Sequence, residues 1–225
     1  MCNLSVLDFF IDNTKVREFD GKRVLEIGSR YVNGSVRPLI ERCSSPKEYL
    51  GVDIESGKFV DVVLPADKIA GHFGSESFDV VVTTELLEHV IDWRVVIDNM
   101  KKVIKRGGHI YVTTCSRGFV YHGYPYDFWR YELEDLAMMF ADFEAITLKK
   151  NPEAHGVFLK AKKPENYVPA DLSGITLYSM VLGRRTRGIP NIEDMPFRRR
   201  LRVELSKVDA GRLIPPILLD LLPPH

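Results

Sequence analysis

The sequence has few cysteines, no excess of charge and no long apolar run. Its 225 residues include three dispersed cysteines, Cys2, Cys43 and Cys115, and such a set forms neither a disulfide framework nor a zinc site. Lysine plus arginine and aspartate plus glutamate both number 31, so the net charge is zero, which disfavours a chain-wide electrostatic contact with nucleic acid. No stretch reaches the ~20 apolar residues of a membrane-spanning helix, and the first residues lack the pattern of a secretory signal. We therefore expect a cytoplasmic protein whose thiols stay reduced.

Short apolar runs of strand length alternate with segments of helical periodicity. The runs are Arg23–Ile27, Tyr49–Val52, Val60–Leu64, Phe78–Val82 and His109–Val112. Because they are apolar on both faces, they predict a parallel sheet that helices cover on both sides. A core of about 150 residues fits the chain length, and a hydrophobic content of 45% is ordinary for a globular protein.

Helical spacing and two further apolar runs complete the predicted core. Residues 4–19 predict a leading amphipathic helix. The apolar residues from Trp93 to Ile104 predict another helix, which we expect Gly107–Gly108 to stop. Ala145–Leu148 and Val157–Ala161 predict two strands, paired antiparallel at the edge of the sheet.

The residues after this core differ in composition. From Arg184 to Arg212 there are nine lysines or arginines and four aspartates or glutamates, a net charge of +5. One interpretation is a segment that packs on the core or on the second subunit of a homodimer. The other is a lid, or a docking surface for an acidic substrate or for the headgroups of a membrane in peripheral contact. We divide the chain into an N-terminal helix at 1–19, an α/β domain at 20–163 and a basic C-terminal extension at 164–225.

Three predicted strands end in residues suited to a ligand. In an open parallel sheet, ligands bind beyond the carboxyl ends of the strands. Gly28 follows the first strand and lets the backbone approach a ligand closely. Asp53 follows the second, where a carboxylate can accept both hydroxyls of a ribose. Glu85 follows the fourth, where an acid could hold an ammonium group. Taken singly, Gly28 is more simply a turn glycine and Asp53 a cap, but the ordered set favours a binding site.

The turn after the first strand lacks a phosphate-binding pattern. A dinucleotide site has Gly-x-Gly-x-x-Gly at this turn, whereas residues 28–34 read Gly-Ser-Arg-Tyr-Val-Asn-Gly. The sequence therefore favours a ligand with a ribose and a positive end but no phosphates.

Four segments resemble the serial motifs of a known family. They are Val24–Ser29, Gly51–Ile54, Phe78–His89 and Ile104–Gly108. They resemble the motifs of class I S-adenosylmethionine-dependent methyltransferases, in particular the small type-11 methyltransferases, over roughly residues 20–162. The resemblance implies an α/β fold with a Rossmann-like, mostly parallel sheet of seven strands, helices on both faces and an antiparallel last strand.

The resemblance also implies how the cofactor S-adenosylmethionine would bind. Its methionine end would lie near Glu26, Gly28 and Ser29, its ribose on Asp53, and its adenine near Ile54 and the turn after the third strand.

Two positions depart from the family pattern. The common Gly-x-Gly reads Gly-Ser-Arg at residues 28–30; a subset of the family shares this variant, so Arg30 is also expected at the cofactor. Pro65 stands where the family has an acid near the adenine. Asp67, or the backbone at Ala66, would serve in its place.

The loop at residues 121–131 is dense in aromatic and titratable side chains. One interpretation is a packed cluster in which Arg130 pairs with Asp127. The other is a wall of the substrate site, with His122 as general base, because an imidazole pKa near 6.5 suits proton removal at neutral pH, and with Asp127 orienting it. The predicted substrate contacts are Tyr124, Arg130 and Tyr131.

This loop resembles the His-Gly-Tyr-Pro-x-Asp-(Phe/Tyr)-Trp-Arg stretch of a methyltransferase subset. Some of its members are associated with glycan or cell-surface polysaccharide pathways, so the analogy favours a glycan-like acceptor. His89 is expected at the floor of the pocket or at the start of a helix, with catalysis as its second role, and Cys115 is expected to be a small buried residue. No cluster of histidine, cysteine and carboxylates has metal-ligand spacing, so we expect no metal.

Three functions remain open at this point. The first, which we expect, is an S-adenosylmethionine-dependent O-methyltransferase that acts on a small-molecule or glycan-like acceptor. The second is a nicotinamide-dependent oxidoreductase, disfavoured by the missing phosphate turn. The third is a non-catalytic relative that binds the cofactor and acts as an interaction module through its basic extension.

Overall fold

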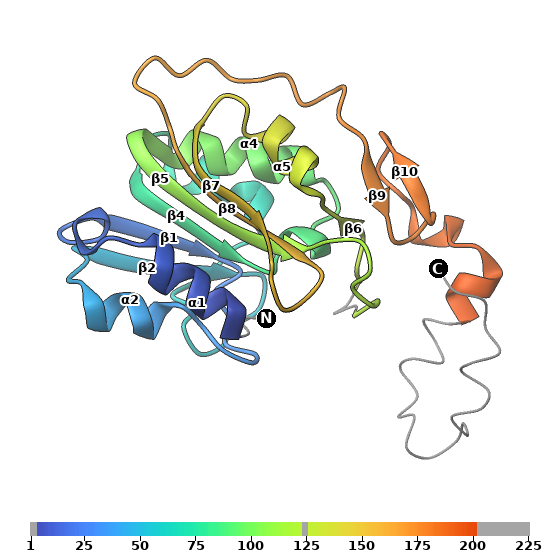
Figure 1. The fold of residues 1–225 in the computed structure, drawn as a ribbon, viewed down its shortest axis with the longest axis horizontal. Helices are drawn as coiled ribbons and strands as arrows, with labels where there is room; N and C mark the ends of the chain where they lie inside the picture. Colours follow the sequence, from blue (N-terminus) through green and yellow to red (C-terminus); the bar gives the residue numbers. More distant parts are fainter. Residues whose placement is uncertain (1–3, 123–125, 202–225) are drawn as a thin grey trace.

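A seven-stranded sheet forms the centre of the protein (Figure 1). The computed structural model describes residues 4–122 and 126–201. The strand order is β3-β2-β1-β4-β5-β8-β7. Neighbouring strands from β3 to β5 run parallel, while β8 is antiparallel to both of its neighbours. The strands are β1 (Arg23–Ile27), β2 (Glu48–Asp53), β3 (Val62–Val63), β4 (Phe78–Thr84), β5 (Ile104–Cys115), β7 (Glu144–Lys150) and β8 (Gly156–Lys162).

This arrangement confirms the predicted Rossmann-like sheet with a reversed last strand. The two strands predicted after the fifth form an antiparallel pair, with β7 at the edge of the sheet. The carboxyl ends of β1, β2 and β4 lie next to one another, because these strands are adjacent and parallel.

Helices cover both faces of the sheet because successive strand residues point to opposite sides. Val24 packs in the apolar cluster beneath α1 and α2, whereas its neighbour Leu25 packs in the cluster beneath α3, α4 and α5. The predicted leading helix divides into α1 and a short 3-10 turn, η1 (Val16–Glu18). The helices are α1 (Leu4–Asn13), α2 (Arg37–Cys43), α3 (Ile69–Phe73), α4 (Trp93–Val103) and α5 (Leu133–Met139). Within the described residues, no helix has the length and apolarity to cross a bilayer.

The expected helix stop at Gly107–Gly108 is wrong. Helix α4 ends at Val103, and Ile104 already has extended backbone and begins β5. The two glycines serve the sheet instead: Gly107 has φ of +73°, and a Cβ on Gly108 would lie 2.7 Å from the carbonyl oxygen of Asp79. Glycine at this point therefore permits the irregular approach of β5 to β4, where the pairing register shifts.

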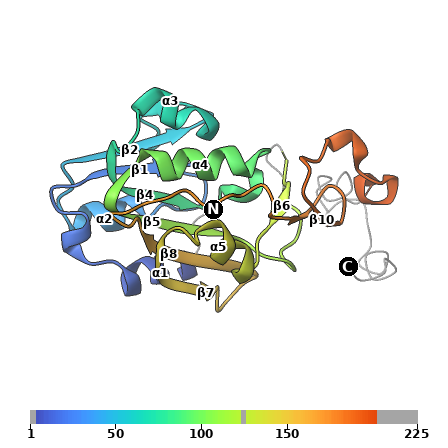
Figure 2. The same cartoon turned by 90° about the horizontal axis from the view of Figure 1, so that it is seen from above.

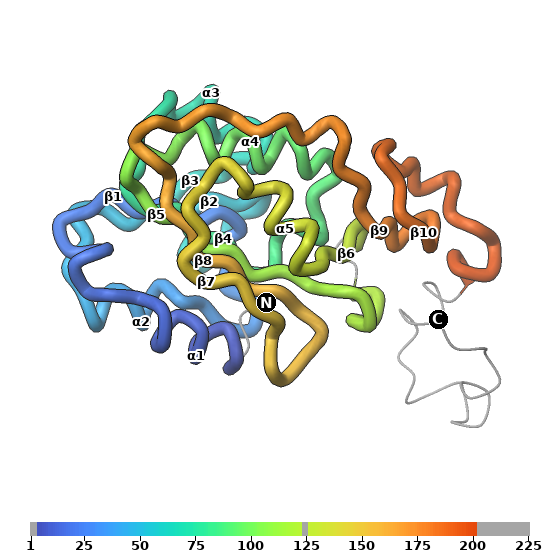
Figure 3. Tube along the Cα trace, turned by 45° about the horizontal axis from the view of Figure 1, so that its top comes forward, coloured from blue at the N-terminus to red at the C-terminus, as the bar shows by residue number. Residues whose placement is uncertain are grey.

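The described part of the C-terminal extension packs on the core. After β8 the chain crosses above α4 and α5 (Figure 3). Arg94 on α4 donates to the carbonyl oxygens of Leu172 and Ile175 at 3.2 and 2.6 Å. The apolar cluster beneath α3, α4 and α5 includes five buried residues of the extension: Leu172, Ile175, Leu177, Val181 and Met195. The described part of the extension thus packs on the core, as in the first of its two interpretations. Its last residues, from position 202, lie outside the described residues.

A small second sheet joins the extension to the loop after β5. Its strands β6 (Trp129–Arg130), β9 (Leu177–Ser179) and β10 (Arg184–Thr186) have the order β10-β9-β6. Figures 1 and 2 show β10 beyond the end of the main sheet at which β5 leads into β6. The extension thus holds the loop that was predicted to face the substrate.

Candidate cofactor and acceptor site

A cavity of about 350 Å³ opens at the carboxyl ends of β1, β2 and β4. Small-molecule sites have volumes in this range. Among the described residues that line the cavity, none is lysine or arginine. The lining is therefore poorly suited to a pyrophosphate. The predicted cofactor contacts that line it are Gly28, Asp53, Ile54, Ala66 and Asp67.

The turn at Gly28 brings two loops together at the floor of this cavity. The amides of Gly28 and Ser29 both donate to the carbonyl oxygen of Val52, at 2.9 and 3.1 Å. Gly28 has φ of +77°, and a Cβ there would lie 3.1 Å from Leu86. Only glycine fits both the backbone conformation and the contact between the loops that follow β1 and β4.

Asp53 presents a carboxylate whose position is set by backbone amides. The amide of Arg30 donates to its Oδ2 and the amide of Glu55 to its Oδ1, both at 3.2 Å. Ile54, beside it, leaves an apolar side chain 59% exposed at the rim, and Asp67 pairs with Lys68 at 3.2 Å. An acid next to an apolar rim fits a ribose bearing a base, because the diol binds the carboxylate and the base covers apolar surface.

Four predicted cofactor contacts lie outside the lining of the cavity. Glu26 accepts a hydrogen bond from the Tyr49 hydroxyl at 2.9 Å, away from the cavity. Burial raises the pKa of Glu26 to about 7. The side chain of Arg30 forms an ion pair with Glu55. Ser29 is buried, with its Oγ near Gly51. The fourth is Glu85. Because none of the four lines the cavity, their contact with the cofactor remains a prediction.

Beside the cavity, Glu88 is the centre of a buried polar cluster. Its side chain is fully buried, and it accepts hydrogen bonds from Thr114 Oγ1 at 2.8 Å and Cys115 Sγ at 3.3 Å. His122 Nε2 lies 3.7 Å and His89 Nε2 4.0 Å from Glu88 Oε1. These contacts outweigh the effect of burial and lower the pKa of Glu88, so the cluster contains a carboxylate anion.

Glu85 adds a second acid to this cluster. Its backbone has φ of +50°, a conformation unfavourable for a residue with a Cβ and often found at functional sites. Burial and then the nearby Glu88 raise its pKa to about 7. The Cys115 thiol donates to Glu85 at 3.2 Å, and burial beside both acids raises the pKa of Cys115 strongly. Cys115 is therefore a protonated buried residue and no nucleophile.

The cluster also brings together donor atoms that are far apart in the sequence. Two groups of three, Glu88–His89–His122 and Glu85–Glu88–Cys115, have donor atoms within 4.8 Å of one another. The expectation of no metal rested on the spacing of ligands along the sequence. That spacing does not reveal these groups, because the fold brings their residues together from separate segments. The hydrogen bonds and ion pairs above already partner each of these side chains within the protein.

His122 lies between two acids, as an imidazolium. Its Nδ1 is 3.1 Å from Asp127 Oδ2, so the predicted contact with Asp127 is present, and Glu88 faces its other nitrogen. Burial alone would lower the pKa of His122, but the hydrogen bonds to Asp127 and Glu88 outweigh it and raise the pKa to about 9. At neutral pH the ring holds both protons, which argues against His122 as a general base.

The stability of the protein should fall at alkaline pH because of His122. A histidine whose pKa is raised by folding stabilises the protein fully below its unfolded pKa of about 6.5 and loses that contribution as the pH rises through its folded pKa. We expect the free energy of unfolding, measured with urea, to decline between about pH 6.5 and pH 9. The variant His122→Gln should show a flatter dependence in this window. An equal slope in both proteins would contradict the ion pairing described here.

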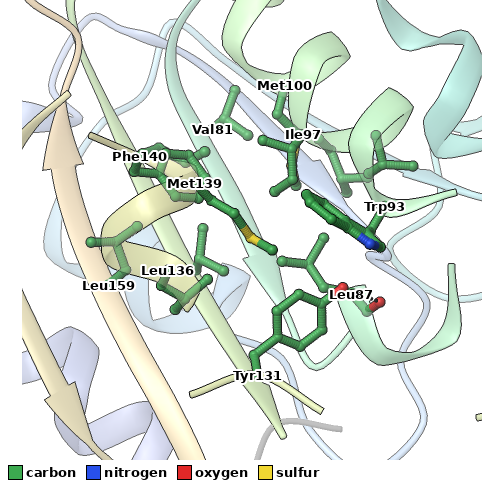
Figure 4. Close-up of a cluster of buried hydrophobic side chains, with 14 of the residues drawn as sticks. Val81, Leu87, Trp93, Ile97, Met100, Tyr131, Leu136, Met139, Phe140 and Leu159 are labelled. Carbon is green, nitrogen blue, oxygen red and sulfur yellow. Dashed lines mark hydrogen bonds between the residues drawn. The ribbon is translucent and has the colours of Figure 1, made fainter. Parts of the chain in front are cut away.

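Arg130 and Tyr131 are buried structural residues, which corrects their prediction as substrate contacts. Arg130 is fully buried; its guanidinium binds both oxygens of Asp127 and the carbonyl oxygens of Phe119 and Val120. Tyr131 packs against Leu87 in the core (Figure 4), and its hydroxyl donates to the Leu87 carbonyl oxygen at 3.0 Å. The described residues Asp127, Arg130 and Tyr131 are therefore packed as in the first interpretation of this loop. The remaining predicted contact, Tyr124, lies outside the described residues.

Sequence reasoning missed part of the cavity wall. Leu86, Val90 and Ile91 line it, together with His89, which was expected at the floor of the pocket or at the start of a helix. The Trp129 indole N–H donates to the carbonyl oxygens of Val90 and Ile91, at 3.0 and 3.1 Å, and so ties this segment to the loop of β6. Their position directly after the fourth strand was the available signal.

A parallel sheet with a reversed last strand, a glycine turn after β1 and an acid after β2 together define a Rossmann-like α/β protein with a ligand cavity at its carboxyl edge. The chain belongs to the family described as "Methyltransferase domain", whose model matches residues 6–157.

Known proteins with similar sequence or structure include methyltransferases and one other enzyme. The ubiquinone biosynthesis O-methyltransferase of Vibrio atlanticus is 31% identical over 108 residues, 44% of this chain and 46% of that protein. The match thus spans about half the length of that relative. The N-methyltransferase NodS of Bradyrhizobium japonicum, solved with S-adenosylhomocysteine, has a TM-score of 0.53 at 15% identity over 72% of this chain and 89% of that chain. The [4+2]-cyclase SpnF has a TM-score of 0.55 at 15% identity, over 71% and 80% of the two chains. At these identities the solved structures share the fold alone.

Proposed function

We propose that the protein is an S-adenosylmethionine-dependent O-methyltransferase that acts on a small-molecule or glycan-like hydroxyl. The observation that carries this proposal is the pairing of two sites. The first is a cavity whose described lining holds the aspartates Asp53, Asp67 and Asp92 but no lysine or arginine, and the second is a cluster of histidines and acids beside it. The first suits a phosphate-free nucleoside, and the second suits proton removal from an acceptor. The family membership and a relative named as an O-methyltransferase support the same reaction.

On the cofactor side, the chain would hold a nucleoside by its sugar and base. Asp53 would accept the two ribose hydroxyls, and Ile54 and the backbone at Ala66 would face the base. S-adenosylmethionine, when bound, supplies an electrophilic methyl group on a sulfonium. The protein's largest contribution would be to hold the acceptor oxygen in line with that methyl group, and such positioning supplies up to ~7–11 kcal/mol.

On the acceptor side, we assign proton removal to His89. Its Nδ1 lies 2.8 Å from the carbonyl oxygen of Tyr126, so Nδ1 carries a hydrogen and Nε2 of the neutral ring is free to accept one. His89 lines the cavity, and Glu88, 4.0 Å from its Nε2, would stabilise the imidazolium that forms. His122, already protonated, would contribute positive charge near the site instead.

Calorimetry followed by a methyl-transfer assay tests the proposal. We expect the purified protein to bind S-adenosylmethionine and S-adenosylhomocysteine, and not to bind NAD. Transfer of labelled methyl groups to small-molecule or glycan fractions should follow, with label that survives conditions cleaving methyl esters. Binding of NAD alone would overturn the proposal in favour of an oxidoreductase. Cofactor binding without transfer to any fraction would favour a non-catalytic relative.

Asp53→Ala should weaken binding of S-adenosylmethionine by about 1–3 kcal/mol, because it removes charge-assisted hydrogen bonds to the ribose. Titration calorimetry of the wild type and the variant gives the difference. Asp12→Ala, an exposed change on α1, serves as control and should bind as the wild type does. A folded Asp53→Ala protein with unchanged affinity would remove Asp53 from the site.

A further inference from the structure

A second cavity, of about 420 Å³, opens at the opposite edge of the sheet. It lies beside η1, where β4 and β5 begin and β8 ends, so it is separated from the cofactor cavity by the length of the strands. Five of its lining residues carry or can acquire positive charge: Arg17, Lys22, Arg106, His109 and Lys162.

Most of this positive charge has no acidic partner. Arg106 pairs with Glu76 at 3.2 Å. In the part of the chain that the structure describes, no carboxylate forms an ion pair with Arg17, Lys22 or Lys162. The cavity therefore presents three cations that have no ion-pair partner among the described residues.

The two acids that line the cavity are already engaged by other groups. Glu18 accepts hydrogen bonds from Lys160 Nζ at 2.8 Å and from the Tyr111 hydroxyl at 2.6 Å. Asp79 accepts from the amide of Arg23 at 2.9 Å and from Lys105 Nζ at 3.0 Å. Because these partners neutralise the two carboxylates, the cavity keeps an excess of positive charge.

His109 lines the cavity among these positive charges. Its ring nitrogen lies 3.8 Å from Glu18. Burial lowers the pKa of His109, and the nearby Lys160, Lys162 and Lys22 lower it further against the opposing effect of Glu18. Lysines from separate segments of the chain thus act electrostatically on the same imidazole, that of His109.

We propose that this cavity binds a multiply charged phosphate anion, either free or as the phosphate chain of a small metabolite. Lysine and arginine are the usual ligands of phosphate oxygens, and a small phosphorylated molecule fits the volume. The site is built from the amino ends of β4 and β5, so the proposal does not depend on methyl transfer.

Titration of the full chain with inorganic pyrophosphate at constant ionic strength tests the proposal. The double variant Lys22→Ala/Lys162→Ala removes two cations from the cavity. The double variant Lys47→Ala/Lys150→Ala removes the same charge from exposed positions outside it. We expect at least a tenfold loss of affinity in the first variant and less than a twofold change in the second. Thermal unfolding of both variants in the absence of ligand checks that they remain folded.

NMR spectra of labelled histidine provide a second readout. The ring signals of His109 should shift with pyrophosphate in the wild type and remain unchanged in the cavity variant. Tighter binding of pyrophosphate than of orthophosphate would identify the phosphate chain of a metabolite as the ligand, and equal binding would identify free phosphate. No binding by the wild type at millimolar pyrophosphate, or equal losses in both double variants, would overturn the proposal.

Discussion

Replacing Arg130 with methionine should lower the free energy of unfolding by about 3–5 kcal/mol, because it removes the guanidinium that binds both oxygens of the buried Asp127 and leaves that carboxylate only its contacts with His122. Both side chains are fully buried, and the guanidinium also binds the carbonyl oxygens of Phe119, Val120 and Trp129. A methionine fills much of the volume but satisfies none of these acceptors. Denaturation with urea at neutral pH measures the loss.

Two comparison variants make this result specific. Arg106→Met breaks an ion pair whose two side chains are 49% and 45% exposed, and such surface pairs contribute about 0–1 kcal/mol. Arg130→Met/Asp127→Leu removes both buried charges and should recover part of the stability, because the Asp127 carboxylate is no longer buried without a guanidinium and His122 keeps Glu88 as its counter-charge. Similar small losses for Arg130→Met and Arg106→Met would show that Arg130 does not stabilise the loop after β5.

His89→Gln should lower kcat by about 10²–10⁴-fold, the range for loss of a general base. Glutamine is similar in size and can keep a hydrogen bond to the Tyr126 carbonyl oxygen, but it has no basic nitrogen. The affinity for S-adenosylmethionine, measured by calorimetry, should change only a few-fold. The rate is to be measured with the acceptor found by the methyl-transfer assay.

Variants of two other histidines distinguish a catalytic base from a residue that only stabilises the structure. His122→Gln should lower stability at neutral pH, because it removes the cation between Glu88 and Asp127. His155→Gln, an exposed change, should affect neither rate nor stability. Full turnover in His89→Gln together with loss of turnover in a folded His122→Gln protein would return the role of base to His122.

Features that depend on short stretches of sequence could be predicted. The alternation of apolar runs with helical segments predicted the order of strands and helices, because each element's periodicity is local. The ligand edge could be predicted from Gly28 and Asp53 for the same reason: parallel strands place the residues that follow them at one edge. One exception was the end of α4, since Gly107–Gly108 had the pattern of a helix stop but serve the close approach of two strands. Another was the leading helix, which ends at Asn13.

The tertiary structure decided which polar side chains contact one another. Glu88 and His122 are 34 positions apart in numbering, and only the fold places their side chains 3.7 Å from each other. Sequence composition alone could not distinguish an Arg130 that faces a substrate from one that is buried against Asp127. The chain by itself determined the sheet, the edge at which the cavity opens and the position of Asp53 in its lining, because these follow from local periodicity. The protonation of His122, the assignment of His89 and the cationic cavity at the far edge required the structure, because charge and pKa depend on neighbours brought together from distant segments.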